Sequence, residues 1–456
     1  VQAFGGSMLT ANSAAILTDA FPRNQRGLAL GINQMAGLSA MFIGLVAGGV
    51  LATIDWRAVF WINVPVGVFG ATWAYLQLRE TSQKTGGPID WLGNLTFAIG
   101  LGSILVAVTY GIQPYGGHAM GWTSPYVLSL LIGGIVVLGL FIVVEARSAA
   151  PMIQLGLFKI RAFVAGNVAG LVTAVARGGL QFMLIIWLQG IWLPLHGYPY
   201  SDTPLWAGIF MLPLTFGFLI AGPISGRLSD RFGARGFATV GACVFGLSFL
   251  GLIALPVDFP YPAFAFFIFA NGVGSGMFAS PNTASIMSSV PAAQRGAAAG
   301  MRATFQNSGT ALSVGVFFSL LIAGLASSLP RTLTEGLERQ GVSPAVAQHL
   351  GSLPPVSSLF AALLGVNPLR HLLVENHALS ALSPNAQALV TGKEFFPDLI
   401  SQPFHDGLVV VFATAAVFAG LAGVASLLRG PRGVPERAAS AVTRAPGADR
   451  HRGAER

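Results

Sequence analysis

Long apolar runs recur along almost the whole of this sequence, and they constrain the fold more than any other feature. Each run is about 20 residues long, which is the length an α-helix needs to cross the hydrocarbon core of a bilayer. The runs are continuous and lack period-two alternation, so spanning helices are expected and a porin-like barrel is not. Only 9% of the 456 residues are charged, against about 25% in an ordinary soluble domain. The predicted fold class is all-α, a polytopic helical membrane protein.

We expect about eleven spans, with boundaries uncertain by several residues. Breakers such as Phe21-Pro22, Gly86-Gly87-Pro88 and Pro256 stand between the runs and end one helix before the next begins. The predicted spans are residues 1–20, 27–53, 57–78, 90–111, 123–146, 162–188, 204–226, 235–255, 260–286, 296–325 and 405–428.

The distribution of basic residues predicts the orientation. The loops on one side of the predicted spans hold eleven Lys and Arg, whereas those on the other side hold only Arg57. Loops rich in Lys and Arg remain in the cytoplasm, so we expect a multi-pass protein of a bacterial cytoplasmic (inner) membrane with a cytoplasmic C-terminus. The net charge of +8 then reflects orientation in a lipid bilayer and not binding to nucleic acid. The basic loop residues are Arg23, Arg26, Arg79, Lys84, Arg147, Lys159, Arg161, Arg227, Arg231, Arg235 and Arg295.

An internal repeat indicates a two-half architecture. The segment Pro22-x-x-Gln25-Arg26-Gly27-x-Ala29-x-Gly31 recurs as Pro291-x-x-Gln294-Arg295-Gly296-x-Ala298-x-Gly300, at a constant offset of 269 residues. Both copies join a helix that ends inside to one that starts inside. The duplication is therefore parallel, as in transporters whose halves are related by an axis along the membrane normal.

A charged stretch from Gly222 to Gly236 lies between two apolar runs, and its pattern G-x-L-x-D-R-x-G-x-R resembles the signature loop of the major facilitator superfamily. The resemblance implies a latch between helices on the cytoplasmic side that breaks in each transport cycle. The local alternative is that Asp230 and Arg231 stabilise the helix ends that they cap. The expected gating residues are Gly226, Arg227, Asp230, Arg231, Gly233 and Arg235.

Further segments resemble the fourteen-helix drug:proton antiporters of the EmrB/QacA type. Residues 55–67, Asp-Trp-Arg-Ala-Val-Phe-Trp-Ile-Asn-Val-Pro-Val-Gly, are close to that family's W-R-W-x-F-x-I-N-x-P-x-G outer turn. Pro151-Met152-Ile153-Gln154-Leu155 and Leu205-Trp206-Ala207-Gly208 also match. The resemblance implies that three further helices precede residue 1, and that the protein exports hydrophobic or amphipathic drug-like compounds, often cationic, in exchange for protons.

The predicted organisation combines the spans, the repeat and this resemblance. Residues 326–404 are too polar for one span and are expected to form an extracytoplasmic insert that caps the outer mouth, with docking of a periplasmic adaptor protein as the alternative. The predicted regions are 1–78, the remainder of the N-terminal six-helix half; 79–150, two inserted linker helices; 151–325, the C-terminal half; 326–404, the insert; 405–428, the last span; and 429–456, a disordered cytoplasmic tail.

One family motif is present in altered form. The resemblance places the antiporter glycine pattern, which ends G-P-x-x-G-G, at Gly37, Gly44, Gly48 and Gly49, but Leu45 stands where the family has proline. The inference of obligate antiport is weaker without this proline kink. Gly37, Gly44 and Gly48 still share a helix face and are expected to permit close helix contact.

Catalytic motifs are missing from the sequence, which has no Walker motif and no helical H-E-x-x-H, and its single cysteine, Cys243, excludes a cysteine metal cluster. We therefore expect a non-enzyme without cofactor or metal, driven by an ion gradient or by the substrate gradient. The acidic residues near the spans, including Asp19 and Glu145, lie at helix ends and are expected to pair with arginine. The resemblance places an acidic residue in the family's first helix, which implies a proton-carrying carboxylate upstream of residue 1.

Polar residues inside the spans are the candidates for a substrate pathway, because such groups are costly in hydrocarbon and usually face a cavity or another helix. The alternative is that these residues only join helices, and for Arg177 this alternative is less favoured than a place in the pathway. The candidates are Asn12, Asn33, Gln34, Asn167, Arg177, Gln181, Asn271, Asn282, Arg302, Gln306 and Asn307.

Two other functions of the protein remain open: a narrow exporter of one metabolite or antibiotic, since arginines favour anions, and a non-transporting receptor or scaffold.

Overall fold

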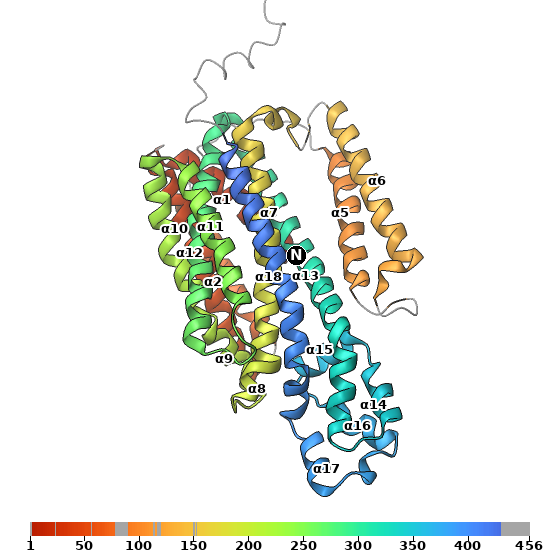
Figure 1. Cartoon of the computed structure of the whole chain (residues 1–456). Coiled ribbons are helices and arrows are strands. Elements are labelled where there is room, and N and C mark those ends of the chain that lie inside the picture. Colours follow the sequence, from red (N-terminus) through yellow and green to blue (C-terminus); the bar gives the residue numbers. More distant parts are fainter. Residues whose placement is uncertain are drawn as a thin grey trace, which may run out of the picture.

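The regular elements of the computed structural model are helices that run side by side as an elongated bundle (Figure 1). The structure describes residues 2–22, 24–55, 57–77, 90–112, 115, 120–148, 151 and 153–429. Within this part, nine helical segments are long and apolar enough to cross a membrane, and they coincide with nine of the predicted spans. The other two predicted spans correspond to α1 (Gln2–Ala20) and α2 (Arg26–Ile54). The protein is a multi-pass helical membrane protein, as predicted.

The chain is built from a first group of helices, a separate hairpin and a larger second group (Figure 1). After α1 and α2, the first group holds α3 (Ala58–Trp61) and α4 (Asn63–Gln77). The hairpin is α5 (Trp91–Gly111) and α6 (Pro125–Arg147), with the short turns η1 (Gly121–Thr123) between them and η2 (Leu155–Lys159) after them. The second group is α7 (Arg161–Trp187), the π-helical turn η3 (Leu188–Trp192), α8 (Leu193–Leu195), α9 (Thr203–Phe210), α10 (Leu212–Phe232), α11 (Ala234–Ile253), α12 (Tyr261–Ser289), η4 (Ala292–Gln294), α13 (Arg295–Arg339) and α18 (Phe395–Leu427).

The second group is packed around an apolar core. The largest buried side chains include Trp187 on α7, Phe249 on α11, Phe264 on α12 and Phe412 on α18. By contrast, α4 exposes a band of apolar residues such as Phe69 and Trp73, as expected for a surface that faces lipid.

The helix α13 is much longer than the span predicted for it. It continues beyond residue 325 to Arg339 without a break, because Leu325, Leu329, Leu333 and Leu337 recur every four residues and bury one face. Its far end packs against the small helices α14 (Pro344–Gly351) and α15 (Pro355–Leu363). The chain then continues through α16 (Pro368–Glu375), η5 (Leu379–Ala381) and α17 (Pro384–Val390). Since α18 begins at Phe395, the segment between the two long helices is shorter than the predicted 326–404.

The hairpin of α5 and α6 stands apart from the bundle and touches it along α13 (Figure 1). The indole Nε1 of Trp122 donates to Ser319 Oγ at 3.1 Å. At the start of the hairpin, Asp90 caps α5 by accepting a hydrogen bond from the Gly93 amide at 2.8 Å. At the same end of the hairpin, near the end of α6, a carboxylate oxygen of Glu145 accepts from the Ile153 amide at 3.2 Å.

The charged stretch expected to be a loop is mostly helix, and the loop prediction is wrong for residues 226–232. Helix α10 runs through Pro223 to Phe232, and α11 begins at Ala234. Only Gly233 separates them, with a φ of +96° that favours glycine over any L residue. Asp230 therefore sits on the last turn of a helix, and its carboxylate reaches outward to another element.

Candidate functional site

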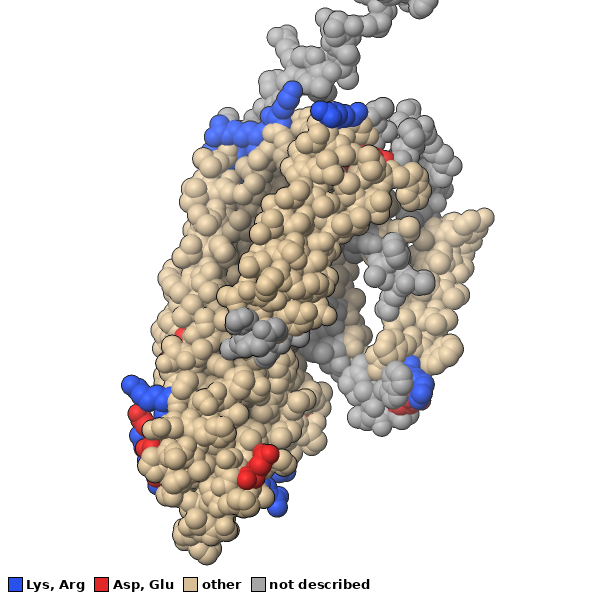
Figure 2. Space-filling view, turned by 90° about the vertical axis from the view of Figure 1, so that its right-hand side faces the viewer, with Lys and Arg blue, Asp and Glu red and all other residues tan. Residues whose placement is uncertain are grey.

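Basic side chains gather at the end of the bundle where α2, α7, α11 and α13 begin, here called the basic end. Figure 2 shows Lys and Arg concentrated there, in contrast to the mixed charges at the opposite end. Its residues include Arg26, Arg161, Arg231, Arg235 and Arg295. Two contacts between the first and second groups of helices lie at this end.

The first contact joins α2 to α10. Asp230 accepts hydrogen bonds from the backbone amides of Gly27, at 2.8 Å to Oδ1, and of Leu28, at 3.2 Å to Oδ2. These amides belong to the first turn of α2, where helix geometry leaves N–H groups unpaired and the macrodipole favours an anion. Asp230 thus caps a helix 203 positions away in the sequence. This arrangement combines the two alternatives from the sequence, because Asp230 stabilises a helix end and that helix belongs to the other group.

Glycines allow the two helices to approach at this contact. A Cβ added at Gly31 would lie 2.8 Å from the Gly222 carbonyl oxygen and 2.9 Å from Pro223 Cα. A Cβ added at Gly27 would lie 2.9 Å from the Gly226 carbonyl carbon. Both helices therefore carry small residues four positions apart, which lets their backbones meet.

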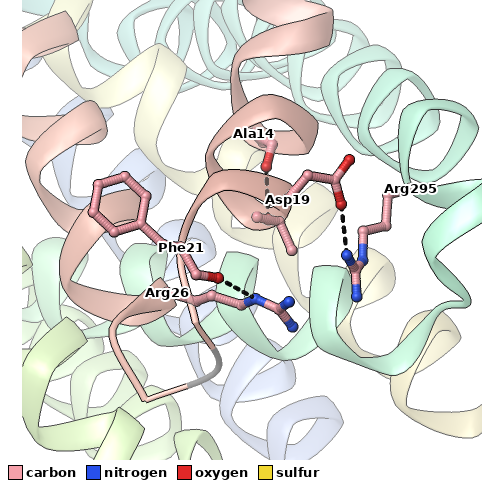
Figure 3. Close-up of polar contacts among 6 residues, drawn as sticks. Ala14, Asp19, Phe21, Arg26 and Arg295 are labelled. Atoms are coloured by element: carbon pink, nitrogen blue, oxygen red, sulfur yellow. Dashed lines mark hydrogen bonds and ion pairs between the residues drawn. The ribbon is translucent and has the colours of Figure 1, made fainter. Parts of the chain in front are cut away.

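The second contact is an ion pair between the end of α1 and the start of α13 (Figure 3). Arg295 Nη1 lies 2.5 Å from Asp19 Oδ1, which confirms the prediction that Asp19 pairs with an arginine. Arg26 is the repeat counterpart of Arg295 but instead donates from Nε to the Phe21 carbonyl oxygen at 3.2 Å, within its own half. The two arginines of the repeat therefore differ in these hydrogen bonds, although Arg26 also lies near enough to Asp230 for their charges to interact.

A polar cavity of about 40 Å³ lies between α2, α7, α12 and α13. Gln34 comes from α2, in the first group of helices, and the other lining residues come from the second group. Gly31 and its contact with α10 lie one turn before Gln34, so the cavity is close to the contact that joins the two groups at the basic end. It is lined by Gln34, Gly166, Asn167, Gly170, Leu171, Thr173, Ala174, Arg177, Ser275, Phe278, Ala279, Asn282, Thr283, Arg302, Phe305 and Gln306.

Two guanidinium groups line this cavity, and a third approaches it. Arg302 donates from Nη1 to Gln306 Oε1 at 2.8 Å and to Thr283 Oγ1 at 3.4 Å. Arg177 lies with its guanidinium 5.9 Å from the centre of the Phe218 ring. Beyond the end of α18, Arg429 donates to Asn282 Oδ1 and to Ser426 Oγ. None of the lining residues in the described part of the chain is Asp or Glu.

The cavity brings together six of the predicted pathway residues, namely Gln34, Asn167, Arg177, Asn282, Arg302 and Gln306. The remaining five do not line it. Asn271 ties α12 to α11 by donating to Ser248 Oγ at 2.9 Å, and Asn12 donates to the Met8 carbonyl oxygen within α1. Asn33 and Gln181 are partly buried on α2 and α7, and Asn307 is exposed on α13.

Close helix contact at the predicted glycine motif is not made by the described residues. A Cβ at Gly37 or Gly44 would have no atom within 4 Å, and Gly48 and Gly49 fall outside the residues whose side-chain surroundings are described. The close contact is made instead by Gly27 and Gly31, whose four-residue spacing was visible in the repeat. Arg429 was also missed, because it follows the last apolar run directly and was assigned to the tail.

Comparison with known proteins identifies relatives of this chain. The family model described as the Major Facilitator Superfamily matches residues 1–91 and 89–314. The riboflavin transporter RibZ of Clostridioides difficile is 28% identical over 326 residues, which are 71% of this chain and 67% of that protein. The methyl viologen resistance protein SmvA of Salmonella typhimurium is 29% identical over 403 residues, 85% of this chain and 76% of that protein. The tetracenomycin C resistance and export protein of Streptomyces glaucescens is 25% identical over 365 residues, 79% of this chain and 65% of that protein. The chain thus spans about two thirds to three quarters of the length of these relatives.

Proposed function

Because the chain belongs to the major facilitator superfamily, we propose that it works as a secondary active transporter that exports hydrophobic or amphipathic small molecules by alternating access, in exchange for protons. The observation that carries this proposal is the polar cavity between the two groups of helices, next to the contacts that join them at the basic end. A small molecule held there touches both groups, so their relative movement exposes it to one side of the membrane at a time.

The contacts at the basic end suit a gate that opens and closes. They consist of hydrogen bonds to Asp230, the ion pair of Asp19 with Arg295, and backbone contact between glycines. All of them form and break without covalent change. Separation of α2 from α10 would open a path between the basic end and the cavity.

The basic end is proposed to face the cytoplasm of a bacterial cell across its inner membrane. Support comes from the concentration of Lys and Arg in the short loops at this end, since such loops are retained in the cytoplasm during insertion. In this orientation, opening at Asp230 admits substrate from the cytoplasm, and opening at the other end releases it outside. A periplasmic adaptor docked on α14 to α17 remains an expectation from the sequence alone.

Exchange for protons is proposed to act on the gate at Asp230. This carboxylate holds α2 against α10 by accepting two backbone hydrogen bonds. Protonation removes its charge and leaves fewer acceptor sites, which weakens this contact. Proton binding from one side and release to the other would then bias the gate, as antiport requires.

A second candidate is a narrow exporter of one metabolite or antibiotic. Arg177 and Arg302 favour it, because two fixed positive charges discriminate among ligands more than an apolar pocket does. The resistance and export protein for tetracenomycin C among the relatives is compatible with such a role.

Expression in a bacterial strain that lacks its own efflux pumps tests the proposal. We expect reduced accumulation of amphipathic dyes and abolition of this effect by an uncoupler. Growth inhibition by a panel of unrelated compounds separates the two candidates, since resistance to one compound alone supports the narrow exporter. Unchanged accumulation of the dyes and unchanged resistance throughout the panel, in cells with confirmed membrane insertion, would refute both.

A further inference from the structure

We infer that the cavity binds the negatively charged group of its substrate between the guanidinium groups of Arg177 and Arg302. This inference rests on the proposed function and names the substrate class for the same site. The expected ligand is an amphipathic organic anion, such as an aromatic carboxylate or sulfonate.

The first observation is that Arg177 lies deep along α7 without a polar partner among the described residues. It lies 16 residues after Arg161, at which α7 begins, and therefore about 24 Å along the helix at 1.5 Å per residue. Its guanidinium makes no hydrogen bond or ion pair with any residue that the structure describes, and it lies over the Phe218 ring. A charge at this depth in a membrane protein is costly unless a counter-charge or a polar cavity compensates it.

The second observation is the incomplete pairing of Arg302. The acceptors on Nη1 are the neutral side chains of Gln306 and Thr283. Its Nε atom is buried and has no acceptor among the described residues. Because a planar guanidinium presents its donors in a fixed fork that matches a carboxylate, this side chain is suited to receive an anion.

A third arginine adds to the positive field. Arg429 is buried and donates to Asn282, which itself lines the cavity, while Nε and Nη1 of Arg429 have no acceptor in the described part of the chain. The cavity therefore has two arginines in its wall, a third one behind Asn282, and no lining carboxylate within that part. A cationic ligand would be repelled by all three.

The size and remaining lining of the cavity refine the ligand class. The volume open to the centre of a water molecule is about 40 Å³, about three times the 10–15 Å³ that a single water requires on the same measure. The cavity therefore has room for a carboxylate or sulfonate group, and the body of a larger molecule must enter as the helices separate. Phe278 and Phe305 in the wall then offer rings against which an aromatic body can pack.

Transport of two permanently charged probes by the full chain in proteoliposomes tests this inference. The probes are 2-naphthalenesulfonate and 2-naphthyltrimethylammonium, which share the aromatic body and differ in charge. We expect uptake of the sulfonate to exceed that of the ammonium at least about tenfold, since a charge-assisted hydrogen bond contributes roughly that factor or more. Excess chloride distinguishes a site for organic anions from a site for small inorganic ions. If the site binds small inorganic ions, excess chloride would abolish sulfonate uptake, whereas gluconate at equal ionic strength would not.

Variants connect the selectivity to the arginines. Arg302→Gln and Arg177→Gln are each expected to lower the affinity for the sulfonate about 10- to 100-fold. Arg302→Lys keeps the charge and is expected to retain most of the preference for the anion, which a purely structural role would not predict. The control is Arg331→Gln on the same helix. The Arg331 side chain is 81% exposed and pairs with Glu335, so this change is expected to leave the affinity for the sulfonate unchanged.

The outcomes separate the inference from the function on which it rests. Preference for the ammonium probe, or equal uptake of both probes, would overturn the anion site and leave transport itself standing. Unchanged sulfonate affinity in both glutamine variants would also overturn it, as would complete block by chloride. Failure to transport either probe or any compound of the resistance panel would refute the proposed function as well.

Discussion

Replacement of Gly31 by alanine is expected to weaken the closed gate at the basic end. The added Cβ would meet the Gly222 carbonyl oxygen at 2.8 Å, whereas ordinary contact begins at 3.4 Å. The obstacle is backbone and not a flexible side chain, so α2 and α10 must separate by about 0.6 Å, the difference between these distances. Such separation also lengthens the hydrogen bonds from Gly27 and Leu28 to Asp230.

The free energy by which Gly31→Ala destabilises the closed gate has two parts. Overpacking of this kind costs about 1–3 kcal/mol, and loss of one hydrogen bond to a charged group costs about 1.5–3 kcal/mol. A total of about 2.5–6 kcal/mol shifts the ratio of closed to open gates by a factor of about 60 to about 20,000. A gate that is mostly closed before the change would therefore be mostly open after it.

The repeat provides a matched control. Gly300 occupies the position of Gly31 in the second copy, and a Cβ there would have no atom within 4 Å. Alanine has the higher helix propensity at both sites, so this contribution cancels in the comparison. Gly300→Ala is expected to leave the gate closed.

Spin-label distances across the basic end provide the assay. Labels on cysteines at Ala20, the end of α1, and at Phe232, the end of α10, report the separation of the two groups of helices, in a background where the exposed Cys243 is replaced by alanine. We expect Gly31→Ala to populate a longer distance that Gly300→Ala does not. Identical distance distributions in the two variants would refute the argument that backbone contact at Gly31 holds the gate.

Three more changes probe the gate and the turn beside it. Asp230→Asn removes the charge at the start of α2 and is expected to weaken the contact by about 1–3 kcal/mol, so that dye efflux is lost while the amount of protein in the membrane is unchanged; normal efflux would contradict this role. Arg295→Asp is expected to abolish efflux, and Asp19→Arg in the same chain to restore it at least in part, because the ion pair is rebuilt in reverse; no recovery would count against the pair. Gly233→Ala forces a φ of +96° on a residue with a side chain and is expected to destabilise the protein by about 1–3 kcal/mol. Thermal unfolding in detergent would report this loss, and Gly236→Ala, which has open space around its Cβ position, is expected to show none.

The spans and the repeat could be predicted from the sequence because they depend on local composition. A run of about 20 apolar residues is helical in a bilayer whatever its neighbours are. The same argument failed at the end of α13, where the helix continues beyond the apolar run. There, leucines four residues apart stabilise it by packing against the short helices after it, and that packing depends on the tertiary fold.

The site was only partly predictable for the same reason. Arg177 and Arg302 could be proposed because charges inside spans are rare and costly. The partner of Asp230 could not, since it is a pair of backbone amides about 200 residues away, and an amide carries no signal in the sequence. Gly27 and Gly296 stand in identical motifs, yet only Gly27 packs closely against another helix. Sequence repetition therefore predicts equivalent positions but not equivalent surroundings.

Transport by the purified chain in liposomes tests the central claim most directly. The measurement is uptake of the two permanently charged naphthalene probes into vesicles with and without an imposed pH gradient, acidic inside. The account predicts that at least the sulfonate accumulates while the gradient lasts and leaks out when an ionophore collapses it. Protein-dependent binding of the probes that is the same with and without the gradient, and with no accumulation inside the vesicles, would contradict the account.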